Sequence, residues 1–461
     1  MPTLWVDVDD LLAHVQRRER MTGIFRVVHE LCAALHRDGA RFVRHAPGAA
    51  LFIEIDWPPV VRAIAAVEAA HRSPAGTGRS MPSWLQTPAR ALFRHLPPVV
   101  AVALGVSLQG LKAFAFGLAG LPAAWRQSRA TAAAMALHER PFRPGPDDVI
   151  FSPGAPWVDR LHALRVATAR SRGLRYALLV HDIIPLRRPE WCSLGHTLNF
   201  AQWFTAVAPQ ADHLLTISHA TAEDVMTHAA RTGMDIVTPQ VVPMGTGFTL
   251  PPLGEPSTRL PKPGSYVLFV STLEGRKNHI LAVRIWRRLL EEMPTGSVPQ
   301  LVFVGRPGPQ TLDLMGQLSN SNYLDGAILH LDDASDSELR QLYEGCRFTL
   351  FPSLYEGWGL PVTESLAFGR PCLAARATSL PEAGGTFARY FDPDNLHDAV
   401  AVVRAALEDE AGMEEMAAQI RADFRAATWD DMATAARQVC TAAPVTRQPA
   451  PPVVTEVRVL A

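Results

Sequence analysis

Cysteine is scarce in this chain, and its few copies are scattered. The five cysteines lie at positions 32, 192, 346, 372 and 440, and no two of them form a C-x-x-C pair. Disulfide frameworks and structural zinc sites both need cysteines at short, repeated spacings. The pattern therefore predicts reduced thiols that mostly fill the core of a cytosolic protein. A metal-ligand set of the Cys/His type is not evident, so we expect no metal in the site.

A net charge of either sign is also missing. The chain has 44 Lys and Arg residues against 45 Asp and Glu residues, which gives a formal net charge of −1. Because nucleic-acid binding depends on excess positive charge, we expect no nucleic-acid partner. The first ten residues, MPTLWVDVDD, are acidic and lack the charged-then-apolar pattern of a signal peptide. We therefore expect a protein that stays in the cytoplasm.

Long hydrophobic runs are missing as well, although one segment comes close. Between Pro97 and Trp125, Lys112 is the only ionised residue. Glycines at 105, 110, 117 and 120 favour two short helices over one membrane span. Two alternatives stay open, because the helices can pack on the protein or lie on a membrane surface. With arginines flanking the segment, we expect residues 88–129 to make a peripheral contact with the inner face of the cytoplasmic membrane.

The length of the chain exceeds what one hydrophobic core fills. With 461 residues, two domains are the default expectation. Apolar runs alternate with helical patterns, which is typical of doubly wound α/β domains. Residues 249–264 hold five prolines and two glycines, which predicts an interdomain linker. The expected order is a Rossmann-like domain over 1–248 with an insert at 73–145, the linker, a second Rossmann-like domain over 265–428, a helix over 429–443 and a disordered tail over 444–461.

Apolar runs mark the expected strands of each domain. In the first domain they are Leu4–Val8 (ending at Asp9 and Asp10), Arg41–His45, Leu51–Ile55, Asp148–Phe151, Tyr176–Val180 and Leu214–Ile217. In the second domain they are Tyr266–Val270, Leu301–Val304, Ile328–Leu331, Phe348–Phe351 and Pro371–Ala375. A loop that holds Arg17 and Gly23 leads from the first strand into an expected helix over Ile24–Leu35.

The strongest chemical signal lies in residues 351–369, FPSLYEGWGLPVTESLAFG. Glu356 and Glu364 bracket its turn with seven residues between them. A helix is predicted to begin at the turn, so the free amides near Gly359 and Leu360 form a ready anion site. Since a carboxylate repels phosphate, the two glutamates suit sugar or ribose hydroxyls. The alternative is a pair of solvated surface glutamates, which the continuous string disfavours.

Other polar residues follow expected strands, where doubly wound sheets bind their ligands. Arg276 and Lys277 lie between a strand and a helix and can neutralise a diphosphate. His181 and Asp182 come directly after a strand and can hydrogen-bond a sugar. The alternatives are a solvated cation pair and a structural histidine.

Two glycines complete the set of candidates. Gly23 stands at the junction before the first expected helix, where it allows close backbone approach or only forms a turn. Gly305 ends the strand Leu301–Val304 in the second domain, where we expect it on the donor side.

These residues fall in strings that resemble one family. EGWGLPVTESLAFGRP, from Glu356 to Pro371, resembles the E-x7-E signature of retaining GT-B glycosyltransferases of family 4, with Trp358 where phenylalanine is frequent. TGIFRV, HDIIPL and RKN resemble the same family at matching places, and HDIIPL is similar to its mannosyl- and rhamnosyltransferase-like members. The resemblance covers nearly all of the chain except residues 73–145 and the tail.

The resemblance implies a metal-independent transfer with retention of anomeric configuration. A sugar, with mannose or rhamnose the leading choices, would pass from a GDP- or dTDP-linked donor to a glycan or lipid-linked acceptor in surface polysaccharide biosynthesis. No cofactor is expected beyond this co-substrate. The implied roles are ribose binding by Glu364, contact with the transferred sugar by Glu356 and His181, stabilisation of the diphosphate by Arg276, Lys277, Gly359 and Leu360, and acceptor-side positions for Gly23 and Asp182.

Two alternatives remain. A nucleotide-sugar epimerase of GT-B architecture would need no acceptor, and a catalytically silent GT-B module would only bind. The intact cations and glutamates weigh against a silent module.

Overall fold

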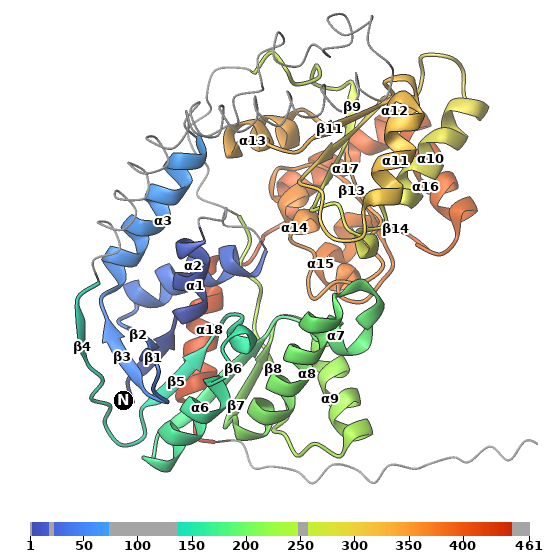
Figure 1. Cartoon of the computed structure of the whole chain (residues 1–461). Coiled ribbons are helices and arrows are strands. Elements are labelled where there is room, and N and C mark those ends of the chain that lie inside the picture. The colour runs from blue at the N-terminus through green and yellow to red at the C-terminus, as the bar shows by residue number, and fades with distance from the viewer. Residues whose placement is uncertain (1, 18–22, 73–136, 248–256, 445–461) are drawn as a thin grey trace, which may run out of the picture.

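The computed structural model describes residues 2–17, 23–72, 137–247 and 257–444. Within them, two β-sheets with helices on their faces form two bodies, one blue to green and the other yellow to orange in Figure 1. Two doubly wound α/β bodies are the predicted fold class. Residues 88–129, for which we expect a membrane contact, and residues 445–461 of the predicted tail lie outside the described residues.

The first sheet has eight strands and is mostly parallel. Its order is β4 (Glu139–Pro141), β3 (Phe52–Ile55), β2 (Arg41–His45), β1 (Leu4–Asp7), β5 (Val149–Ser152), β6 (Arg175–Val180), β7 (His213–Thr216) and β8 (Gln240–Val241). Only β3 pairs antiparallel, with β2 on one side and β4 on the other. The strands β1, β5 and β7 are buried along their whole length, as continuous apolar runs require. Its helices are α1 (Asp9–Gln16), α2 (Ile24–Arg37), α3 (Trp57–Arg72), α6 (His162–Ser171), α7 (Ile184–Arg187), α8 (Leu194–Val207) and α9 (His219–Thr232).

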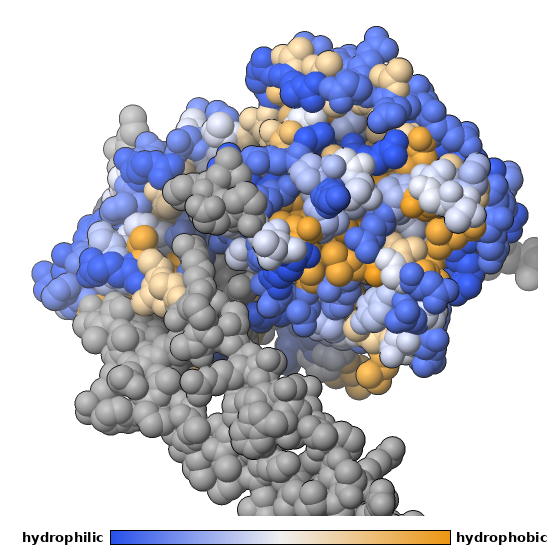
Figure 2. Space-filling view, turned by 90° about the horizontal axis from the view of Figure 1, so that it is seen from above, coloured by the Kyte–Doolittle hydropathy of each residue, from blue (hydrophilic) through white to orange (hydrophobic). Residues whose placement is uncertain are grey.

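The second sheet has six strands, all parallel. Its order is β11 (Ile328–Leu331), β10 (Gln300–Val304), β9 (Tyr266–Val270), β12 (Thr349–Phe351), β13 (Cys372–Ala375) and β14 (Ala388–Phe391). Its helices are α10 (His279–Glu292), α11 (Leu312–Asn320), α12 (Asn322–Asp325), α13 (Asp336–Gly345), α14 (Leu360–Ala367), α15 (Leu380–Gly384), α16 (Leu396–Glu408) and α17 (Glu410–Asp423). Figure 2 views the molecule from this end, where hydrophilic residues cover most of the coloured surface and hydrophobic ones gather in smaller groups.

The last described helix, α18 (Trp429–Thr441), returns to the first sheet. It packs against α2 and against β1, β5 and β7. Met432, Ala433, Ala436 and Cys440 are buried in the same core as Leu4 and Val6. The side chain of Trp429 lies against Gly245, where an added Cβ would come within 2.3 Å of the indole ring. The last described helix thus belongs to the first domain.

The start of the chain differs from the prediction. The first strand was expected over Leu4–Val8, with a loop after Asp9 and Asp10, but β1 ends at Asp7 and Asp9 begins α1. Acidic residues suit a first helical turn, because the amide groups there carry partial positive charge. Leu11, Leu12 and Val15 bury the inner face of this helix. Because α1 has only eight residues, its few apolar positions do not distinguish a helix from a loop that follows the strand.

The insert predicted over residues 73–145 was also too long. Its last residues include β4, which pairs with β3 and so belongs to the first sheet. The sequence pattern also did not predict α3, α8, α17 or β14. Among the described residues, no helix has both the length and the apolar character needed to cross a membrane.

Candidate active site

The turn between β12 and α14 presents free backbone donors. Gly359 precedes the helix with φ of 113°, a left-handed conformation that favours glycine, and a proline occupies the first turn. Among the described residues, no side chain hydrogen-bonds to this helix start as a cap. Pro361 has no N–H, and the amide of Val362 donates to the carbonyl oxygen of Gly359 at 2.9 Å. Within the described residues, the amides of Gly359 and Leu360 therefore remain available to an anion.

Glu356 lies beside this turn between two cations. Lys277 Nζ is 2.5 Å from its Oε1, and Arg276 Nη1 is 2.8 Å from its Oε2. Ser353 Oγ donates a third hydrogen bond to Oε1 at 2.6 Å. Burial alone would raise the pKa of Glu356, but Arg276 and Lys277 lower it to about 2. Glu356 is therefore ionised, and its two oxygens hold the two cations in place.

The two cations respond differently to this pairing. Burial would lower the pKa of Arg276, but Glu356, Glu274 and Asp182 raise it above its usual range. For Lys277, burial and the neighbouring guanidinium lower the pKa, against the opposing effect of Glu356. Arg276 also donates to the carbonyl oxygen of Tyr355 at 2.9 Å. The structure thus brings together three of the predicted site residues at the carboxyl ends of β9 and β12.

Glu364 lies on α14 and is almost fully buried. Its Oε2 accepts a hydrogen bond from Tyr343 OH at 2.9 Å. Its Oε1 is 3.0 Å from Nη1 of Arg26, which belongs to α2 of the first domain. Burial raises the pKa of Tyr343 well above its usual range, with Glu364 adding to the effect, so the phenol stays a neutral donor. No signal in the sequence had placed Arg26 at this glutamate.

His181 meets the glutamate turn from across the domain boundary. An added Cβ on Gly357 would fall 2.2 Å from the carbonyl oxygen of His181, so only glycine allows this approach. The ring Nε2 lies 2.7 Å from the carbonyl oxygen of Pro153 and must carry the hydrogen. Burial lowers the pKa of His181, against the opposing effects of that carbonyl and of Asp182. The histidine is therefore neutral and stands where the two domains touch.

The remaining predicted residues are Asp182, Gly23 and Gly305, and they differ in their surroundings. Asp182 Oδ1 accepts from the amide of Ile184 at 3.0 Å and so fixes the turn before α7. Gly23 precedes α2 with φ of 56° and has open space where a Cβ would be. Gly305 has φ of 147°, and a Cβ there would lie 1.9 Å from the carbonyl oxygen of Ser271. The glycine at 305 is thus required by the close approach of neighbouring strand ends.

Polar contacts also join the two domains around Glu356. Glu382 accepts from the amides of His219 and Ala220 at 2.7 and 2.8 Å, which caps α9 of the first domain. Tyr355 hydrogen-bonds to Asp224 of the first domain, and Arg187 Nε lies 3.0 Å from the same carboxylate. These contacts fix the opposite domain next to the residue that precedes Glu356.

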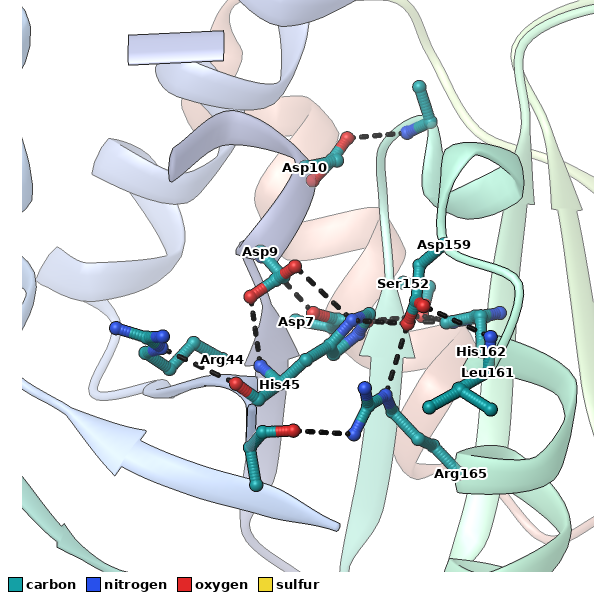
Figure 3. A network of polar contacts seen from close by, with 12 residues as sticks. Asp7, Asp9, Asp10, Arg44, His45, Ser152, Asp159, Leu161, His162 and Arg165 are labelled. Atoms are coloured by element: carbon teal, nitrogen blue, oxygen red, sulfur yellow. Dashed lines mark hydrogen bonds and ion pairs between the residues drawn. The ribbon is translucent and has the colours of Figure 1, made fainter. Parts of the chain in front are cut away.

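A second buried charge cluster lies in the first domain and was not predicted (Figure 3). We call it the Asp7 network; it consists of Asp7, Asp9, His45, Asp159, His162 and Arg165. His45 Nε2 is 3.0 Å from Asp7, and its Nδ1 is 2.8 Å from Asp159 and 3.2 Å from Asp9. Burial would lower the pKa of His45, but the three carboxylates raise it to about 12. The imidazolium is the positive centre of the network, and Arg165 Nε adds a contact to Asp159 at 3.0 Å.

Three members of the Asp7 network have the spacing of a metal site. In the described part of the chain, Asp7, His45 and His162 alone bring three possible ligand atoms within 4.8 Å of one another. However, Trp203 Nε1 donates to His162 Nδ1 at 3.1 Å, so the ring hydrogen of this neutral histidine lies on Nε2. An Nε2 that carries hydrogen offers no lone pair to a metal. The donor set therefore fits an ion-pair network better than a metal centre.

The comparisons with known proteins agree with the geometry of the second domain. The profile of glycosyl transferases group 1 matches residues 255–423. These residues form most of the second domain. It contains both glutamates and both cations of the candidate site.

Sequence relatives carry mannosyltransferase names. The chain is 29% identical over 263 residues to the serotype-specific mannosyltransferase WbdA of Escherichia coli. This match covers 54% of this chain and 32% of WbdA. It is 30% identical over 169 residues to O-antigen chain mannosyltransferase B of Escherichia coli (37% of this chain, 44% of the relative). It is 31% identical over 218 residues to an MMP alpha-(1->4)-mannosyltransferase of Mycolicibacterium hassiacum (45% and 48%). The chain thus spans from about a third to about half of the length of these relatives.

Solved structures share the whole architecture. A sucrose-phosphate synthase from Thermosynechococcus elongatus matches with a TM-score of 0.54 at 16% identity, covering 95% of this chain and 98% of its own. HepE of Anabaena, solved in complex with UDP and glucose, matches with a TM-score of 0.50 at 17% identity, covering 92% and 94%. At such identities the likeness concerns the fold, and it confirms the predicted GT-B architecture.

Proposed function

We propose that this protein is a retaining glycosyltransferase that moves mannose from a GDP-linked donor to a glycan or lipid-linked acceptor in surface polysaccharide biosynthesis. The main observation in support of this proposal is the cluster of Arg276, Lys277 and Glu356 beside the uncapped start of α14. The cluster lies inside the region that matches the glycosyl transferases group 1 profile. The choice of mannose rests on the names of the sequence relatives. Rhamnose from a dTDP-linked donor is the alternative substrate.

The chemistry demanded of the site is the departure of a nucleoside diphosphate. Negative charge grows on the leaving phosphate as the bond to the sugar breaks, and donors already in place stabilise it without rearrangement. Arg276, Lys277 and the amides of Gly359 and Leu360 at the start of α14 supply that positive environment. Glu356 keeps the two cations oriented before the donor arrives. With Ser353 also bonded to Oε1, one acceptor position remains on Oε2, which can accept a hydrogen bond from a sugar hydroxyl. The neutral ring of His181 adds a hydrogen-bonding group at the same boundary.

The test is a transfer assay with the purified chain. GDP-mannose and dTDP-rhamnose would each be offered with a mannose-terminated oligosaccharide or its lipid-linked form, and the products analysed by mass spectrometry and NMR. We expect one donor to be consumed only with acceptor present, giving a linkage with the same anomeric configuration as the sugar has in that donor. Release of an altered free sugar or nucleotide-sugar without acceptor would instead support the epimerase alternative.

Metal independence is part of the proposal. Because two cations already face the leaving group, a divalent ion is not needed to neutralise it. We expect turnover to persist in excess EDTA at more than half of its original value. Complete loss on chelation with recovery on adding magnesium or manganese would contradict this expectation.

A further inference from the structure

Arg26 connects the two domains at a carboxylate that matters for the donor. It lies in the first turn of α2, and its guanidinium reaches Glu364 on α14 at 3.0 Å. The side chain of Arg26 is 20% exposed and that of Glu364 is 5% exposed, so this is a largely buried pair. A buried carboxylate needs a counter-charge or strong hydrogen bonds to stay ionised. The first domain supplies that counter-charge to the second.

Apolar residues at the start of α14 pack against the core of the first domain, as do those at the start of α2. Ile24 and Phe25, which begin α2, lie against the same hydrophobic cluster as Trp358 and Leu360, which flank the start of α14. The side chain of Arg26 therefore lies within the contact between the two domains, not on a surface far from it. Its position follows from the contact between the two domains.

The hydrogen-bonding capacity of Glu364 leaves room for a ligand. A carboxylate offers about four acceptor positions on its two oxygens. Tyr343 uses one position on Oε2, and Arg26 uses one on Oε1. One further position then remains on each oxygen. That arrangement matches the two neighbouring hydroxyls of a ribose, each of which donates one hydrogen bond.

We propose that Arg26 is a positioning residue for the donor nucleotide, which holds the Glu364 carboxylate from the opposite domain and so completes the ribose site across the domain boundary. The inference rests on the proposed function, which assigns the ribose to Glu364. It adds that neither domain alone forms the ribose site. The nucleotide is bound with its full selectivity for ribose only when α2 and α14 are in contact.

The test separates the ribose from the rest of the nucleotide. Binding of GDP and of 2′,3′-dideoxy-GDP to the full chain would be measured by calorimetry for the wild type, Arg26→Gln, Arg26→Lys and Arg37→Gln. Arg37 is a matched control because it lies on α2 and pairs with Asp430 at 2.6 Å, but both members of this pair are exposed. Thermal unfolding of each variant would show that it is folded.

The wild type is expected to bind GDP at least about 10-fold more tightly than the dideoxy analogue, as for two hydrogen bonds to a charged group. Arg26→Gln should reduce that ratio to below about 3, whereas Arg37→Gln should leave it unchanged. Arg26→Lys, which keeps the charge but loses the planar fork, should fall between the two. Should Arg26→Gln not fold, the lysine variant carries the same test.

Three results would overturn the inference. Unchanged affinities for both nucleotides in the Arg26 variants would show that this residue does not act on the nucleotide. An equal loss for both nucleotides would place its effect on the diphosphate or on the fold. If the wild type binds GDP with no preference over the dideoxy analogue, Glu364 is not the ribose site. Failure of the wild type to bind any nucleoside diphosphate would instead reject the proposed function itself.

Discussion

The two domains each bury a cluster of charges at the carboxyl ends of parallel strands, but the clusters are built differently. Around Glu356, two cations share one carboxylate, Arg276 also pairs with Glu274 at 2.9 Å, and the group lies beside the free amides of Gly359 and Leu360. In the Asp7 network, three carboxylates surround one imidazolium. The first arrangement has positive groups that can turn to an incoming anion. In the second arrangement, the charged groups are paired with one another, which suits a structural role.

Lys277→Ala and Arg276→Ala should have the largest effects and would sharpen this comparison. Each removes positive charge that faces the leaving diphosphate, so we expect turnover to fall by about 10²–10³-fold, with a much smaller change in stability. Initial rates at saturating donor, together with melting temperatures, would measure both quantities. A variant of either residue that keeps near-normal turnover would remove that residue from the diphosphate role.

His45→Gln should act on stability instead. It leaves three carboxylates without their central cation, and breaking a buried ion pair by removing one partner costs about 3–5 kcal/mol. We expect the free energy of unfolding in urea to fall by about 3 kcal/mol, whereas turnover per folded molecule should change less than about threefold. Arg37→Gln, which breaks an exposed pair, serves as the control and should cost less than about 1 kcal/mol. A His45 variant as stable as this control would show that the network does not support the fold.

The pH dependence of stability should follow from the same histidine. The pKa of His45 in the folded protein is about 12, above its ordinary value near 6.5. A raised pKa means that the stabilisation is fully present below about pH 6.5 and is lost as the pH rises toward 12. Between pH 7 and pH 9, the free energy of unfolding should therefore fall by up to about 1.4 kcal/mol per pH unit more in the wild type than in His45→Gln. Parallel curves for the two proteins would contradict a charged His45.

The contrast between the clusters also explains what could be predicted from the sequence. Glu356 and Glu364 lie in one continuous string, and Arg276 and Lys277 are adjacent, so local patterns were enough to find them. The Asp7 network draws on β1, α1, β2 and the segment from Asp159 to Arg165, and no short spacing announces it. Parallel strand order decides which strand ends meet, and that order follows from packing of the whole sheet.

The same reasoning applies to residues that join the domains. The alternation of strands and helices predicted two α/β bodies, and the GT-B architecture agrees with it. The contact between Arg26 and Glu364 depends on how the bodies face each other, which no local pattern encodes. Asp182 was expected toward the acceptor, and its carboxylate is found bonding to the amide of Ile184. Strand ends are predictable positions, but the direction of each side chain is set by its neighbours.

Ser353→Ala should give the smallest effect and would test how tightly Glu356 must be held. Ser353 Oγ donates to Oε1 of Glu356 at 2.6 Å, and both groups are buried. Loss of one hydrogen bond to a charged group costs about 1.5–3 kcal/mol, partly offset here by the two cations. We expect turnover to fall by about 3- to 10-fold, with little change in the binding of GDP. A loss as large as that of Lys277→Ala would show that the serine has a more direct part in the reaction.

The central claim is that the charge cluster of the second domain performs the reaction, whereas that of the first domain holds the fold. The most direct measurement is turnover per folded molecule and melting temperature for Lys277→Ala and His45→Gln, made side by side in one transfer assay. The account predicts a crossed result, in which Lys277→Ala loses about 10²–10³-fold in turnover at a nearly unchanged melting temperature, and His45→Gln melts earlier but keeps its turnover. Equal losses of turnover in both variants, or an active Lys277→Ala, would contradict it.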